Sequence, residues 1–150
     1  MKSLPATIKK LTHSDSGHLA ELIRIYANAF ESKNFCLPEE AYLKSLLSNR
    51  QMVFCAALLN NKVAGGLTAY ILPSVYERVS LVYIYDLAVE PNYQRQGLGR
   101  ELLSFLRDHC RKNGYREMFV QADFDDEDAK SFYRATGGRP QKAFQFNYYL

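Results

Sequence analysis

Hydrophobic side chains recur along the 150-residue chain with two different spacings. In the first third they recur every three to four residues, over 19–30 and again over 42–47, which is the spacing of amphipathic helices. Pro38 is a favourable first residue for the second helix, which we expect to end near Asn49. A short strand over 7–11 should precede both helices.

Continuous or alternating apolar runs follow, and these predict strands. The runs 52–59 and 62–72 are joined by Asn60-Asn61, two residues that tolerate positive φ and therefore predict a hairpin turn. The run 80–89 is apolar on both faces, which is typical of a central strand. The remaining predicted elements are a helix from Leu98 that ends at Gly114, a strand over 117–122, a helix over 127–136 and a final alternating strand over 142–150.

The predicted order of elements is β-α-α-β-β-β-α-β-α-β. This order favours an α/β fold with a mixed (α+β) sheet that has helices on both faces. The strands 80–89 and 117–122 should be parallel, because a helical crossover joins them. A length of 150 residues fits a single domain over 1–150.

Composition excludes several classes of protein. Hydrophobic residues make up 47% of the chain and charged residues 23%, as in an ordinary globular protein. A net charge of +3 is too small to indicate a nucleic-acid partner, and no run approaches the ~20 apolar residues of a membrane span. Without an apolar leader segment, a cytoplasmic location is expected. The three cysteines and three histidines show no metal-ligand spacing, so no metal site is predicted.

The stretch "YDLAVEPNYQRQGLGRELL" (85–103) places a glycine-rich, basic corner between the central strand and a helix. Helix N-termini have unpaired N–H groups and attract anions. Gly97 and Gly99 would let the backbone approach such an anion, and Arg95 and Arg100 add positive charge. The spacing matches neither the dinucleotide nor the P-loop motif. From these residues alone, a tight turn and a phosphate site both remain open.

Two segments in order resemble the GCN5-related N-acetyltransferase (GNAT) superfamily. The first is 83–122 with its Gln94-Arg95-Gln96-Gly97-Leu98-Gly99 turn, and the second is "AKSFYRATGG" (129–138). The resemblance implies the GNAT fold with a splayed pair of parallel strands. It also implies acetyl-CoA as cofactor, with the pyrophosphate on backbone amides of 95–100 and the pantetheine arm along 87–89. The cofactor residues so implied are Leu87, Ala88, Val89, Gln94, Arg95, Gln96, Gly97, Leu98, Gly99 and Arg100.

Two residues are candidates for the chemistry of acetyl transfer. Asp86 is the only carboxylate in the central strand, where an unpaired charge is costly to bury. It is either a hydrogen-bonded structural residue or the group that anchors or deprotonates the acceptor amine. Tyr133 matches the tyrosine of the family's second signature, which implies an acid that protonates the departing CoA thiolate. Without that match, Tyr133 would be interpreted as a core tyrosine.

Three segments resemble one branch, the aminoglycoside 3-N-acetyltransferases of the gentamicin acetyltransferase type. They are 65–77, 83–89 and the acidic run that follows Gln121-Ala122. This branch implies a small cationic amine as substrate, and antibiotic resistance as the biological role. Asp125 and Asp126 stand where the superfamily often has an asparagine, which leaves that CoA contact open. The carboxylates available for the acceptor are Glu77, Asp86, Asp123, Asp125 and Asp126.

Other acceptors also fit an acidic groove. A polyamine, a small metabolite amine and a protein lysine or N-terminus stay open, and so does a CoA-binding domain without turnover. The aromatic C-terminus "FQFNYYL" indicates either a homodimer interface or core burial.

Overall fold

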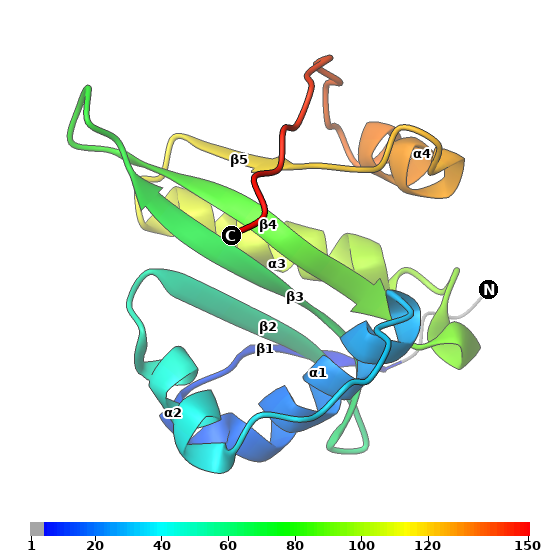
Figure 1. The fold of residues 1–150 in the computed structure, drawn as a ribbon. Helices are drawn as coiled ribbons and strands as arrows, with labels where there is room; N and C mark the ends of the chain where they lie inside the picture. Colours follow the sequence, from blue (N-terminus) through cyan, green and yellow to red (C-terminus); the bar gives the residue numbers. More distant parts are fainter. Residues whose placement is uncertain (1–4) are drawn as a thin grey trace. The chain divides into compact units, whose positions relative to one another are not determined.

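A single five-stranded sheet organises most of the chain in the computed structural model, which describes residues 5–150 (Figure 1). Its strand order is β1-β2-β3-β4-β5. The first four strands are antiparallel neighbours, and β4 and β5 are parallel, so the predicted mixed sheet is confirmed. The strands are β1 (Thr7–Lys10), β2 (Met52–Leu59), β3 (Lys62–Pro73), β4 (Ser80–Val89) and β5 (Glu117–Val120).

The predicted helices are present. They are α1 (Ser16–Ala29), α2 (Glu40–Ser48), α3 (Leu98–Lys112) and α4 (Glu127–Ala135), with short 3₁₀ turns at His13–Asp15 and Pro91–Tyr93. The chain divides into two compact units, one up to Val120 and one from Gln121 to Leu150, and each is described by itself. The first unit holds the sheet and α1 to α3, and the second holds α4.

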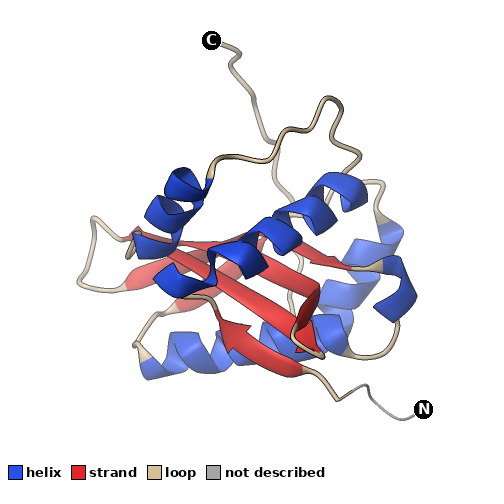
Figure 2. Cartoon of the chain, turned by 90° about the horizontal axis from the view of Figure 1, so that it is seen from below, coloured by secondary structure: helices blue, strands red, loops and turns tan. Residues whose placement is uncertain are grey.

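Helices cover both faces of the sheet, as the sequence predicts. Helices α1 and α2 lie on one face and α3 on the other (Figures 1 and 2). The first layer is a buried cluster in which Leu19 and Leu22 of α1 pack with Phe54 and Ala56 of β2. Gly66 of β3 makes this close packing feasible, since a Cβ there would lie 2.6 Å from a methyl carbon of Leu22.

Turn residues end the elements where the sequence predicts. Asn60 and Asn61 have φ values of 49° and 63°, so the β2–β3 hairpin prediction is confirmed. Gly114 has a φ of 69° just after α3, and its N–H donates to the carbonyl of Arg111 at 3.2 Å. The next N–H, of Tyr115, donates to the Cys110 carbonyl at 3.0 Å, which closes α3 in the manner of a Schellman cap.

Several predicted boundaries shift by one or two residues, and one predicted strand is absent. Helix α2 begins at Glu40, two residues after Pro38, and β5 ends at Val120. The predicted strand over 142–150 is wrong, because 139–150 has neither helix nor strand and Phe144, Phe146 and Tyr148 are at least 79% exposed. Alternation makes a strand only where a neighbouring strand supplies hydrogen bonds. Within 121–150 the one regular element is α4.

Candidate active site

A β-bulge in β4 decides where Asp86 points. Thr68 of β3 pairs with Asp86, but the next residue, Ala69, pairs with Ile84, so Tyr85 is an extra residue in β4. Directly opposed residues on neighbouring strands share a face of the sheet. Ile84 and Ala69 are fully buried away from the α1 cluster, whereas Thr68 contacts α1. The bulge therefore turns Asp86 to the α1 face. Strict alternation along β4 would instead place Asp86 on the face of Ile84.

Asp86 lies at the end of a hydrogen-bonded group that starts in the core. The Tyr26 hydroxyl of α1 is 3.0 Å from Thr68 Oγ1, and both residues are buried. Thr68 lies directly opposite Asp86 on the neighbouring strand, and hydrogen bonding from its hydroxyl lowers the pKa of the Asp86 carboxyl. Burial raises the pKa of the Asp86 carboxyl above that of an exposed aspartate, and the Thr68 hydrogen bond offsets part of this effect.

Three tyrosine rings form a cluster on the region of β3 and β4 that holds Asp86. The Tyr85 ring meets Tyr70 and Tyr83 edge-on, with ring centroids 5.7 and 5.8 Å apart. Tyr83 also stacks on Phe119 of β5 at 4.7 Å. Burial raises the pKa of Tyr70 and of Tyr83, and the negative charge of Asp86 adds to both shifts. A carboxylate among aromatic rings is a favourable surface for an organic cation.

The parallel strands part just beyond this point. The last paired residues of β4 and β5 are Ile84 and Val120, although β4 continues to Val89. On its other side, β4 remains paired with β3 as far as Gly65 opposite Val89. The β4 backbone therefore extends beyond β5 over 85–89, which contains Leu87, Ala88 and Val89. An extended ligand arm could pair with this edge as a further strand does.

The glycine corner follows directly and opens α3. Gly97 is the N-cap residue with a φ of 89°, and nothing lies within 4 Å of the position that a Cβ would occupy. Arg95 also has a positive φ, 58°, which is uncommon for a residue other than glycine. The side-chain amides of Gln94 and Gln96 donate to the carbonyls of Val89 and Asn92 at 3.0 and 3.1 Å. These bonds hold the corner in shape while the first N–H groups of α3 face outward along the helix axis.

This arrangement combines a helix N-terminus with open space, a strand edge and a carboxylate beyond it. The profile of the acetyltransferase (GNAT) family matches residues 19–137. The chain belongs to the GNAT acetyltransferase family. Its mixed sheet with a parallel β4–β5 pair and helices on both faces is the GNAT fold.

Several relatives are similar over nearly the whole chain. A crystal structure of the aminoglycoside acetyltransferase meta-AAC0020, from an uncultured soil metagenomic sample, in complex with sisomicin is 39% identical. It covers 97% of this chain and 96% of its own, with a TM-score of 0.94. The aminoglycoside acetyltransferase HMB0005, also from a soil metagenome, is 29% identical over 98% and 99% of the two chains, with a TM-score of 0.85. The uncharacterized N-acetyltransferase YhfO of Bacillus subtilis is 28% identical over 91% and 92%.

The second GNAT signature lies in the unit 121–150. Tyr133 is half-buried on α4, and its carbonyl accepts the N–H of Gly138 at 2.8 Å, so the helix ends in the predicted glycine bend. Burial raises the pKa of the Tyr133 phenol, and the charge of Asp126 adds to the shift. Asp126 has a structural role as well, because its carboxylate caps α4 by accepting the N–H of Ala129 at 2.9 Å. Asp123 and Asp125 are exposed on the segment before α4.

The structure separates Glu77 from Asp86. Glu77 lies on the loop before β4 and forms an ion pair with Arg116. Asp86 lies six residues beyond the first residue of β4, Ser80, which is about 20 Å along the strand at ~3.3 Å per residue. The predicted acceptor carboxylates of the first unit therefore do not converge. The aromatic neighbours Tyr70, Tyr83 and Tyr85 were not predicted, because only the register of β3 and β4 brings them to Asp86.

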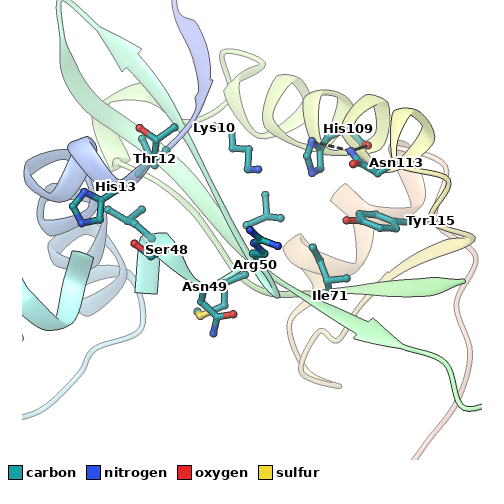
Figure 3. Close-up of a pocket in the computed structure, with 14 residues that line it drawn as sticks. Lys10, Thr12, His13, Ser48, Asn49, Arg50, Ile71, His109, Asn113 and Tyr115 are labelled. Carbon is teal, nitrogen blue, oxygen red and sulfur yellow. Dashed lines mark hydrogen bonds between the residues drawn. The ribbon is translucent and has the colours of Figure 1, made fainter. Parts of the chain in front are cut away.

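A basic cavity lies at the far end of α3 from the glycine corner (Figure 3). It has a volume of about 240 Å³ and contains none of the predicted site residues. Lys10 and Arg50 point into it beside His109, which lies near the C-terminus of the 15-residue α3. That helix spans about 22 Å, and its C-terminal dipole end attracts cations. The C-terminal end of α3 is therefore a favourable neighbour for this positive charge.

Residues 5–150 contain no group of three or more His, Cys, Asp or Glu side chains placed to hold a metal ion. Within the same residues, none of the helices has the length and apolar character needed to cross a membrane.

Proposed function

We propose that this GNAT acetyltransferase transfers the acetyl group of acetyl-CoA to the 3-amino group of an aminoglycoside. The observation that carries the proposal is the 39% identity, over 97% of the chain, to an aminoglycoside acetyltransferase crystallised with sisomicin. The choice of the 3-amino group rests on the sequence segments that resemble the 3-N branch.

The donor half of the proposal uses the glycine corner and the free edge of β4. The open space at Gly97 and the N-terminus of α3 fit a pyrophosphate, with the N–H groups of 95–100 as donors. Leu87 and Val89 would pair through their backbone with the pantetheine arm. Arg95 and Arg100 would add charge that suits the phosphates. Acetyl-CoA supplies a thioester, whose acyl carbon is attacked by the acceptor nitrogen.

The acceptor half of the proposal is centred on Asp86. An ammonium acceptor loses two protons in the reaction, one before its nitrogen can attack and one as the C–N bond forms and the C–S bond breaks. One proton ends on the CoA sulfur and the other is released to solvent. Asp86 would anchor the ammonium group and take its proton, directly or through water. Tyr133 would protonate the CoA thiolate, and its raised pKa keeps the phenol protonated at neutral pH. Asp123 and Asp125 would attract the other amines of a polycationic substrate.

The test is an acceptor panel. The protein is incubated with acetyl-CoA and sisomicin, spermidine or a lysine peptide, while free thiol is followed and the product is examined by NMR. We expect thiol release with sisomicin and an acetyl group on its 3-amino nitrogen. Acetylation of another nitrogen would overturn the regiochemistry. Release with spermidine or the peptide alone would overturn the aminoglycoside assignment, and acetyl-CoA binding without release to any acceptor would overturn turnover itself.

A further inference from the structure

We infer that Tyr26 and Thr68 are positioning residues for the proposed reaction, forming a directed hydrogen-bond chain from the core that holds Asp86 as an ionised acceptor. The inference rests on the proposed function for its consequence in catalysis. The geometry of the chain stands independently of the acceptor, because all three residues lie within the first unit.

The three residues come from three different elements. Tyr26 lies on α1, Thr68 on β3 and Asp86 on β4. The oxygen atoms of Tyr26 and Thr68 are 3.0 Å apart, with 9% and 4% of the two residues exposed. Thr68 is the cross-strand partner of Asp86 and hydrogen-bonds to its carboxylate. A buried hydroxyl pair that leads to a half-exposed carboxylate connects the core to the candidate site.

The chemistry of the groups determines the direction of the chain. An ionised carboxylate only accepts hydrogen bonds, so the Thr68 hydroxyl must donate its single O–H to Asp86. Thr68 Oγ1 is then left as an acceptor, and the Tyr26 hydroxyl donates to it. Burial and the charge of Asp86 raise the pKa of Tyr26 well above its usual value, so the phenol keeps the proton that it donates. Every hydrogen bond in the chain therefore favours the ionised form of Asp86.

The other titratable groups around the chain are phenols and one thiol. Tyr70 of β3 and Tyr83 and Tyr85 of β4 lie on the same face of the sheet as the chain. Cys55 of β2 acts on Tyr26 from the opposite face, and Tyr42 of α2 acts on Tyr70. Phenols and thiols lose their protons far above the range in which carboxyl groups titrate. Among the groups that act on these three residues, Asp86 is therefore the one that titrates in the acidic range. Without the Thr68 donor, burial alone would favour the protonated carboxyl, which can neither anchor an ammonium group nor accept its proton.

Thr68→Val tests this directly, because valine keeps the shape of threonine and lacks the hydroxyl. We expect the acidic limb of kcat/KM for the acceptor to move up by about one pH unit, the scale on which a hydrogen bond to a charged group shifts a carboxyl. Thr68→Ser should restore the wild-type profile. Tyr26→Phe should shift the limb in the same direction by less, since it removes only the second bond. Affinity for acetyl-CoA should stay unchanged in all three variants.

A second readout needs no acceptor. The carboxyl ¹³C signal of Asp86, assigned by its loss in Asp86→Asn, is titrated by NMR in the wild type, Thr68→Val and Tyr26→Phe. An unmoved Asp86 titration in both variants would overturn the inference, whatever their activity. A shifted titration in a protein that acetylates no aminoglycoside would overturn the proposed function and leave the chain in place. If Thr68→Val does not fold, Tyr26→Phe and Thr68→Ser decide: a downward shift, or no shift, in Tyr26→Phe contradicts the direction of the chain.

Discussion

Replacing Gly65 by alanine should weaken acetyl-CoA binding through the backbone of β4. Gly65 lies on β3 opposite Val89, and an added Cβ would lie 2.7 Å from the Ala88 carbonyl oxygen. The same Cβ would be 3.0 Å from Cα and Cγ2 of Val89. Carbon–oxygen contacts are ordinarily at least ~3.3 Å, so β4 must move by roughly 0.5 Å where the pantetheine arm is proposed to pair.

The magnitude follows from that displacement. Forcing an extra methyl into a packed site costs about 1–3 kcal/mol, and replacing glycine within a strand recovers about 0.5–1 kcal/mol. We therefore expect the free energy of unfolding to fall by about 1–2 kcal/mol. A backbone shift that weakens two hydrogen bonds to the ligand loses about 1–2 kcal/mol of binding at ~0.5–1.5 kcal/mol for each bond. That loss corresponds to a Kd for acetyl-CoA raised roughly tenfold.

Gly66 on the same strand and Gly17 on α1 provide controls. A Cβ at Gly66 would lie 2.5 Å from the Cys55 carbonyl oxygen, so Gly66→Ala should cost at least as much stability, but toward β2 and α1. Gly17 on α1 has nothing within 4 Å of its Cβ position, so Gly17→Ala should stabilise by about 0.4–1 kcal/mol. Calorimetry gives the Kd and thermal unfolding the stability. A Gly65→Ala variant that is destabilised yet binds acetyl-CoA normally would contradict the proposed pairing of the ligand with β4, and so would an equal loss of binding in Gly66→Ala.

Three further substitutions test the other parts of the site. Gly97→Glu should abolish acetyl-CoA binding, measured by calorimetry, while the protein stays folded. The new side chain has room, but it brings negative charge to the anion site, and a residue other than glycine at a φ of 89° costs about 1–2 kcal/mol. Wild-type affinity would refute the pyrophosphate assignment. Asp86→Asn should lower kcat on the acceptor by at least tenfold with acetyl-CoA affinity intact. It should also remove the acidic limb of the pH–rate profile, which the raised pKa of Asp86 places above the pKa of an exposed aspartate. Full activity would exclude Asp86 from the mechanism. Tyr133→Phe should cost less, since water also protonates a thiolate, and an unaltered pH–rate profile would contradict its role as the acid.

Much of the fold could be predicted because its signals are local. A few adjacent residues are enough to predict the Asn60-Asn61 turn, the end of α3 at its glycine and the apolar strand β4. The glycine corner is local in the same sense, since the N-terminus of a helix is an anion site by virtue of its own backbone. The prediction of a strand over 142–150 was wrong because a strand needs a neighbouring strand to pair with, and alternation within one segment does not identify that neighbour.

The partners of Asp86 could not be predicted for a related reason. The sequence pattern indicates only that Tyr26 belongs to the apolar face of α1 and that Thr68 lies in an apolar strand. Nothing in their spacing shows that 42 residues apart their oxygens meet, or that both lead to a carboxylate on a third element. Glu77 shows the converse, because its charge suits an acceptor but the β3–β4 loop places it beside Arg116.

The extra residue in β4 connects the two halves of the proposed reaction. The pairing of β4 with β5 ends at Ile84, and the register skip against β3 falls at the next residue, Tyr85. One irregularity therefore coincides with the point where the strand edge becomes available to an extended ligand, and it also turns Asp86 away from the buried face of Ile84 toward Thr68. A regular strand would supply the edge but bury the carboxylate without its donor, at a cost of several kcal/mol. In the proposed reaction, donor binding and acceptor activation would both depend on this local departure from strand geometry.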